Sequence, residues 1–227
     1  MGSQGSISPL FWENDSRCEG GIFMKKGFKP RELTLLGLLT ALLLVMSFTP
    51  LGYLNIGPLA ITLNTIPVAI AAIALGPTGG AITGAVFGMT SFLQCMGIGG
   101  TSAMGAILFE INPALAFIQR FVPRLLMGWL TGYVFIDFKK LRKPTLAGFA
   151  AGFSAAFFNT VLFMSALVLL FGNTEYLQNL IAGRNVIVFI CAFVGINAVV
   201  EMLAVTTIVG ILAKTLQKAR LIGGAQQ

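Results

Sequence analysis

Residues 61–88 read ITLNTIPVAIAAIALGPTGGAITGAVFG, and this stretch decides the fold class. It contains no ionisable side chain, and a single Gly76-Pro77 pair interrupts it. An apolar run of about 20 residues is long enough to cross a hydrocarbon core of about 30 Å. The stretch therefore predicts two successive membrane spans, about 58–75 and 77–95, joined by a tight turn at Gly76-Pro77.

The rest of the chain has the same character. Of its 227 residues, 56% are hydrophobic and 10% are charged, whereas a soluble domain has about 45–50% apolar and about 25% charged residues. Four further spans are predicted at about 33–49, 106–136, 145–171 and 185–213. The fourth in chain order, 106–136, is long enough to be tilted, or broken near Asn112-Pro113 and Pro123, because proline removes a backbone donor. The predicted fold is an all-α integral membrane protein with six transmembrane helices.

The first 23 residues differ from the remainder. Residues 1–23 are polar, contain glycine and serine without periodicity, and lack the basic-then-apolar order of a secretory signal. We interpret them as a disordered tail or a non-native extension, since Met24 followed by two lysines resembles a natural start. The membrane domain is then 24–227.

Basic residues predict the orientation. They cluster in three places, namely Lys25, Lys26, Lys29 and Arg31; Lys139, Lys140, Arg142 and Lys143; and Lys214, Lys218 and Arg220. With six spans these places share one side of the membrane, which the positive-inside rule makes cytoplasmic. Both termini are therefore expected in the cytoplasm. This clustering also accounts for the net charge of +7 without a nucleic-acid partner.

Catalytic and cofactor chemistry is disfavoured. The chain has no histidine, and its three cysteines are far apart without a CxxC spacing, so a zinc site or histidine-based catalysis is not expected. The glycine-rich stretch 96–105 is not followed by a phosphate-loop lysine. We predict neither an enzyme nor a bound cofactor or metal.

Two arginines lie inside the fourth predicted span. Arg120 and Arg124 are one helical turn apart and share a face. A guanidinium group pairs with a carboxylate through two hydrogen bonds, so this face suits an anionic ligand. Two other interpretations stay open: the arginines extend to the outer interface, or they pair with Glu110.

Other polar side chains fall within the last two spans. Asn159 lies near the middle of the fifth, and Asn197 and Glu201 lie one turn apart in the sixth. An amide suits a ligand with amide or hydroxyl groups, although a hydrogen bond between helices would also explain each asparagine. A lone carboxylate in the membrane needs a partner. The uncharged loop at about 48–58 could cap such a site.

Small residues mark two helix faces. Gly37 and Ala41 share a face of the first span, where loss of bulk permits close approach of another helix, either inside this chain or in a partner. Gly80, Gly84 and Gly88 form a similar face on the third span. For this second face, packing within the chain is the favoured interpretation.

Taken together, these segments resemble the substrate-binding (S) subunits of energy-coupling factor (ECF) vitamin transporters. The resemblance covers about residues 31–215 and is carried by the stretch quoted above, the small pair in the first span, FVPRLLMGWLTGYVF (121–135), FFNTVLFMSALVLLFG (157–172) and GINAVVEMLAV (195–205). Gly37 departs from the alanine that the family often has, and close packing survives that change.

The resemblance implies a multi-pass protein of the prokaryotic cell membrane with a vitamin site beneath its first outer loop. It also implies docking, through Gly37 and Ala41, on a transmembrane coupling subunit that works with two cytoplasmic ATPases. ATP hydrolysis by the ATPase subunits would drive toppling of the loaded S subunit within the membrane. The sequence of this chain contains no Walker motif, which agrees with a role in substrate binding rather than in ATP hydrolysis.

Within the family, the NTV and NAVVE segments resemble the pantothenate-specific branch. The substrate-binding residues inferred on this basis are Asn64, Arg120, Arg124, Asn159, Asn197 and Glu201. Riboflavin, folate, cobalamin-type and pyrimidine-precursor ligands are alternatives. A stand-alone secondary carrier or channel, with Glu201 coupling protons, is the alternative class, and a membrane enzyme has less support.

Overall fold

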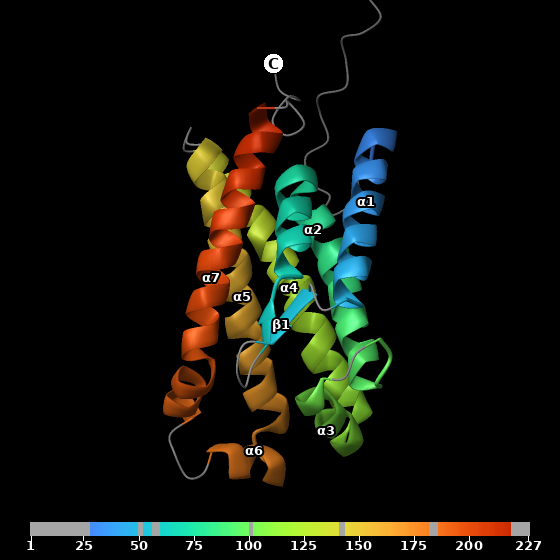
Figure 1. The fold of residues 1–227 in the computed structure, drawn as a ribbon, viewed down its shortest axis with the longest axis vertical. Helices are drawn as coiled ribbons and strands as arrows, with labels where there is room; N and C mark the ends of the chain where they lie inside the picture. The colour runs from blue at the N-terminus through green and yellow to red at the C-terminus, as the bar shows by residue number, and fades with distance from the viewer. Residues whose placement is uncertain are drawn as a thin grey trace, which may run out of the picture.

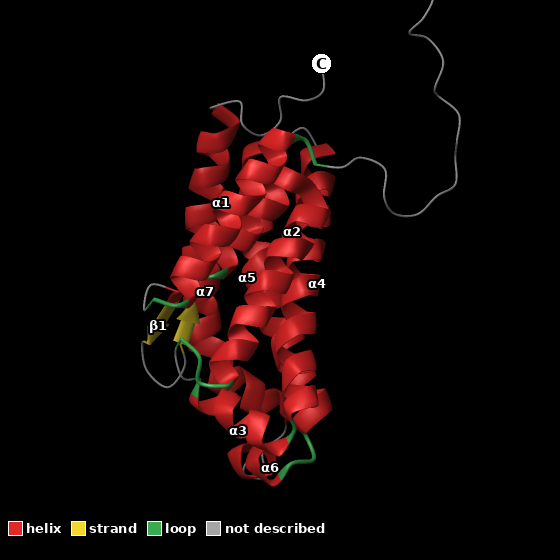
Figure 2. Cartoon of the chain, turned by 90° about the vertical axis from the view of Figure 1, so that its right-hand side faces the viewer, coloured by secondary structure: helices red, strands yellow, loops and turns green. Residues whose placement is uncertain are grey.

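A computed structural model describes residues 28–49, 52–55, 60–99, 102–140, 144–181 and 186–218. The helices are α1 (Pro30–Ser47), α2 (Thr65–Cys95), α3 (Ala103–Ile111), α4 (Pro113–Lys140), α5 (Pro144–Phe171), α6 (Glu175–Ile181) and α7 (Val186–Lys218), and the strands are β1 (Tyr53–Asn55) and β2 (Ala60–Thr62). The long helices run side by side along an elongated bundle (Figures 1 and 2). α1 begins and α7 ends at one end of the bundle, while α3 and α6 lie at the other (Figure 1).

The chain reverses inside α2. Gly76 has φ +76° and ψ −169°, a conformation that glycine adopts without steric penalty. A Cβ atom on Gly80 would lie 2.8 Å from the Cβ of Ala72, although eight residues of continuous helix would separate them by about 12 Å. The two legs of α2 therefore pack against each other, and the predicted turn at Gly76-Pro77 is present.

The residues before α2 correct the sequence prediction. The second span was expected to begin near residue 58, but β2 pairs with β1 in an antiparallel hairpin, with Tyr53 opposite Thr62. A short apolar run does not by itself distinguish strand from helix. The helical leg from Thr65 to Leu75 rises only about 16 Å, and the hairpin lies part-way along the bundle (Figure 1).

Glycines bring α2 and α4 into backbone contact. A Cβ on Gly128 would collide with the carbonyl oxygen of Gly80, and one on Gly84 with the carbonyl oxygen of Arg124. A Cβ on Gly88 would lie 2.8 Å from the Cα of Phe121. The small face of the third predicted span thus packs within the chain, as predicted.

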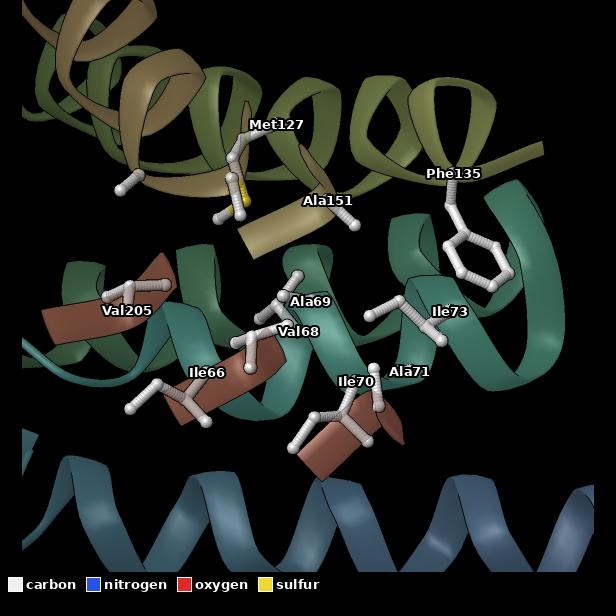
Figure 3. Close-up of a cluster of buried hydrophobic side chains, with 14 of the residues drawn as sticks. Ile66, Val68, Ala69, Ile70, Ala71, Ile73, Met127, Phe135, Ala151 and Val205 are labelled. Atoms are coloured by element: carbon white, nitrogen blue, oxygen red, sulfur yellow. The ribbon is translucent and has the colours of Figure 1, made fainter. Parts of the chain in front are cut away.

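Two apolar clusters hold the helices together. The larger joins α1, α2, α4, α5 and α7. It contains Leu39 and Leu43 of α1, together with side chains shown in Figure 3 that include Ile66, Val68, Ile73, Met127, Phe135, Ala151 and Val205. The smaller contains Leu108, Ala116, Leu167, Phe171 and Leu177, and it fixes α6, which the sequence analysis did not predict. The clusters lie on either side of the polar layer described below, along α4 and α5.

The fourth predicted span is broken, as expected, at Asn112-Pro113. The Asn112 Oδ1 accepts hydrogen bonds from the backbone N–H groups of Ala114 (3.1 Å) and Leu115 (3.2 Å), which satisfies donors at the start of α4. Pro123 does not break α4, which continues to Lys140.

Among the described residues, four helical segments have the length and composition to cross a bilayer: Pro30–Ser47, Thr65–Cys95, Leu146–Phe171 and Ala198–Lys218. The second of these consists of the two legs of α2. α4 is more polar, since it carries Arg120, Arg124 and a charged C-terminal turn. The all-α membrane class is therefore supported, with a small β-hairpin added to it.

Candidate functional site

The inner face of α4 carries both predicted arginines. Arg120 is 6% exposed and Arg124 is 5% exposed. Both guanidinium groups lie over the ring of Phe163 in α5, at 5.2 and 5.0 Å from its centroid, and Arg124 also lies 4.6 Å from the centroid of Phe87. Such contacts between a cation and a ring face are favourable, more so away from water. The arginines point into the bundle, so the interpretation that they extend to the interface is wrong.

Hydroxyl groups hold Arg120. Its Nη1 donates to the Oγ of Ser91 (3.4 Å) and its Nη2 to the Oγ of Ser102 (3.3 Å). Gly105 makes room for this group, because a Cβ there would lie 2.9 Å from Nη2. Arg120 thus ties α4 to α2 and to the start of α3.

Arg124 has fewer polar contacts. Its Nη1 donates to the carbonyl oxygen of Arg120 (2.9 Å), and the Nε atoms of both arginines have no hydrogen-bond partner among the described residues. Within the described ranges neither arginine forms an ion pair with a carboxylate, and Glu110 is exposed. The alternative of a Glu110–arginine pair is therefore not observed. A buried cation is unfavourable unless it is compensated, which makes this face suited to an anion.

Asn159 and Glu201 meet across α5 and α7. The Asn159 Nδ2 donates to the Glu201 Oε1 (3.2 Å), and the backbone N–H of Thr62 donates to Oε2 (3.5 Å). The helices approach closely at Gly152, where a Cβ would lie 3.0 Å from the Cα of Thr206. The interhelical hydrogen bond considered for Asn159 is thus present. Its Oδ1 nevertheless has no described partner.

These polar groups form one layer of the bundle. Phe163, whose ring Arg124 contacts, lies one helical turn after Asn159 on α5, and Asn159 is hydrogen-bonded to Glu201. Asn64, at the start of α2, is fully buried, and neither atom of its amide has a hydrogen-bond partner in the described part of the chain. The structure therefore brings Arg120, Arg124, Asn159 and Glu201 into one part of the bundle, and Asn64 lies two residues after the end of β2. Asn197 belongs to α7, but its side chain lies outside the described residues.

Sequence reasoning missed four polar residues. Gln119 is fully buried, and its amide has no described partner; the same holds for the Tyr53 hydroxyl. Ser91 and Ser102 bind Arg120. Gln119 was detectable as a polar amide within an apolar segment, whereas the serines and Tyr53 carry no distinctive sequence signal.

The small pair on α1 faces away from the bundle. Gly37 and Ala41 are both exposed, and a Cβ on Gly37 would meet no atom within 4 Å. The neighbouring apolar side chains Leu38 and Val45 are 63% and 59% exposed. Packing within this chain does not explain the pair.

Apolar helices around a buried layer of arginines, amides and one carboxylate are typical of a polytopic membrane protein. A sequence model of the family described as "ECF transporter, substrate-specific component" matches residues 31–213, and the chain belongs to that family. The resemblance found from the sequence is confirmed. The chain is a transporter component rather than an enzyme, and a multi-pass membrane protein of a prokaryotic family.

Two relatives extend the comparison. The chain is 27% identical over 209 residues to a pantothenic acid transporter PanT of Lactococcus lactis subsp. cremoris, covering 87% of this chain and 98% of the relative. It is 31% identical over 186 residues to a pantothenate transporter PanT of Leuconostoc mesenteroides subsp. mesenteroides, covering 77% and 86% respectively.

Proposed function

We propose that this chain is the substrate-binding subunit of an ECF transporter that imports pantothenate. The names of both relatives support the ligand. The observation that carries the proposal is a pair of buried arginines without a carboxylate partner among the described residues, next to buried amides with free hydrogen-bonding atoms.

Pantothenate has one carboxylate, one amide and two hydroxyls, and each group has a counterpart here. Arg124 is the carboxylate receptor, because Arg120 is already held by two serines. Asn64 and Asn159 supply amide atoms for the polar middle of the ligand, and Asn197 is assigned to the same role by its position. Phe87 and Phe163 supply apolar walls.

A binding panel tests the ligand. Purified full-length protein is titrated calorimetrically with pantothenate, riboflavin, folate, a cobalamin and a pyrimidine precursor. We expect heat only with pantothenate. Saturable binding of another vitamin and none of pantothenate would disprove the assignment. Uncharged riboflavin in particular would leave the buried arginines unexplained.

The proposed partners are a transmembrane coupling subunit and two cytoplasmic ATPases. The outward orientation of Gly37 and Ala41 supports docking through α1, since small residues allow close helix approach in a membrane. The loaded subunit would then topple within the bilayer, driven by ATP hydrolysis in the partners. In proteoliposomes we expect uptake only when the coupling module and ATP are present. Uptake by the isolated chain would instead support the secondary carrier.

For the topology we propose six crossings with both termini in the cytoplasm, the short leg of α2 completing its crossing together with the hairpin. Lys29 and Arg31 begin α1, Lys139 and Lys140 end α4, and Lys214 and Lys218 lie near the end of α7. These ends lie on one side of the bundle (Figure 1), as the positive-inside rule requires. Labelling of single cysteines introduced at these ends and at α6 tests the topology. Labelling of both sets from the same side would contradict it.

A further inference from the structure

The contact between Glu201 and Asn159 fixes which half of the amide is available. The Asn159 Nδ2 donates a hydrogen bond to the Glu201 Oε1 (3.2 Å), so the NH2 group of the amide faces Glu201. The Oδ1 is then directed elsewhere, and it is buried without a partner in the described part of the chain. Asn159 is 8% exposed, so bulk water is not a ready substitute.

The second oxygen of the same carboxylate is also engaged. The Glu201 Oε2 accepts the backbone N–H of Thr62, at 3.5 Å. Thr62 belongs to β2, which pairs with β1, so this N–H lies on the edge of the hairpin that faces α7. Backbone donors on a strand edge need such a partner when they are buried. One carboxylate thus joins α5, α7 and the hairpin, and its rotation about the side-chain bonds is restricted at both oxygens.

We propose that Glu201 is a positioning residue: it holds the amide of Asn159 so that Oδ1 accepts a hydrogen bond from a hydroxyl or amide N–H of the ligand, which makes the site selective for a donor at this point. This inference rests on the proposed function and assigns one recognition step within it. Without Glu201, an asparagine amide can turn over and present either a donor or an acceptor.

The energetic basis of selectivity is the unpaired acceptor. A ligand without the donor leaves Oδ1 buried and unsatisfied, and sites built to bind a hydroxyl or N–H reject analogues that lack it. Turning the amide over would break the hydrogen bond that its NH2 group donates to the Glu201 Oε1. Glu201 therefore affects discrimination between ligands as well as affinity.

The test measures discrimination by the purified full chain. Its probes are pantothenate and three analogues, lacking respectively the primary hydroxyl, the secondary hydroxyl and the amide hydrogen, the last by N-methylation. The wild type should bind at least one analogue about tenfold or more weakly than pantothenate, as expected for one lost hydrogen bond to a buried group. We call this difference, the affinity for pantothenate divided by the affinity for the analogue, the ratio. In Asn159→Ala the ratio should fall to about twofold or less, because the acceptor is gone.

Glu201→Gln is the decisive variant because it preserves the size of the side chain. An amide at position 201 can donate to a turned Asn159 Oδ1, which relieves the unpaired acceptor, so the ratio should fall at least about threefold from the wild-type value. Glu110→Gln, an exposed position on α3, is the matched control and should retain wild-type affinity and ratio. Melting temperatures of the ligand-free variants confirm that each is folded.

An unchanged ratio in Glu201→Gln or in Asn159→Ala would overturn the inference, as would a wild type that discriminates against none of the analogues. Failure of the proposed function gives a different result. If the wild type binds another vitamin instead, pantothenate is the wrong ligand, and the same donor-deletion comparison on that vitamin decides the role of Glu201. If it binds no vitamin, both proposals are wrong.

Discussion

The contact between α2 and α4 gives a sharp test of the fold, through the substitution Gly84→Ala. The added Cβ would collide with the carbonyl oxygen of Arg124, and it would lie 3.2 Å from the carbonyl carbon of Arg124 and 3.3 Å from the Cα of Leu125. These are backbone atoms, which cannot rotate away as a side chain would. Since carbon atoms pack best at about 3.5–4.0 Å, α2 and α4 must separate locally by about 1 Å.

The change in folding stability caused by Gly84→Ala is the sum of two opposing effects. Overpacking a well-filled interior typically destabilises by about 1–3 kcal/mol, while alanine in place of glycine inside a helix stabilises by about 0.5–1 kcal/mol. Gly37→Ala is the matched control, because its Cβ would meet nothing within 4 Å. This variant is therefore affected only by the higher helix propensity of alanine. The difference between the two variants therefore isolates the packing effect, about 1–3 kcal/mol.

The assay is thermal unfolding of both purified variants in the same detergent. At about 2–4 °C per kcal/mol for a chain of this size, Gly84→Ala should melt at least about 2 °C below Gly37→Ala. Pantothenate affinity of Gly84→Ala should also fall, because the backbone of Arg124 is displaced. If Gly84→Ala melts at or above the temperature of Gly37→Ala, the close approach of α2 and α4 is refuted.

Three further predictions concern the site and the docking face. Arg124→Gln should weaken pantothenate binding about 30-fold or more, since breaking a buried charge pair costs about 2–5 kcal/mol; calorimetry that finds wild-type affinity would remove Arg124 from the site. Ser91→Ala should weaken binding only about twofold to fivefold, because Arg120 keeps its bond to Ser102; a loss as large as that of Arg124→Gln would contradict these roles. Ala41→Leu should leave pantothenate binding by the isolated chain unchanged while abolishing ATP-dependent uptake with the coupling module, because the bulk lies on the exposed face of α1; normal uptake would exclude that face from docking.

The sequence alone determined the membrane class and several local features. Long uncharged runs cannot be accommodated on the surface of a soluble domain, so composition was sufficient. The turn at Gly76-Pro77 and the break at Asn112-Pro113 were also predictable, because glycine and proline restrict the backbone locally whatever packs around them. The cost of polar groups in hydrocarbon marked Arg120, Arg124, Asn159 and Glu201 as candidates for a buried site, but the sequence left open whether the arginines extend to the interface, and only the structure places them inside the bundle.

Only the tertiary structure decided how these groups pair. The hydrogen bond from Asn159 to Glu201 joins residues 42 positions apart, and Thr62 reaches the same carboxylate from 139 positions away. Whether Gly37 packs inside or faces outward likewise depends on how α1 is rotated against α2. Helical periodicity gives the faces of each helix but not the neighbour that each face meets, because that neighbour is fixed by side-chain packing between segments remote in the chain.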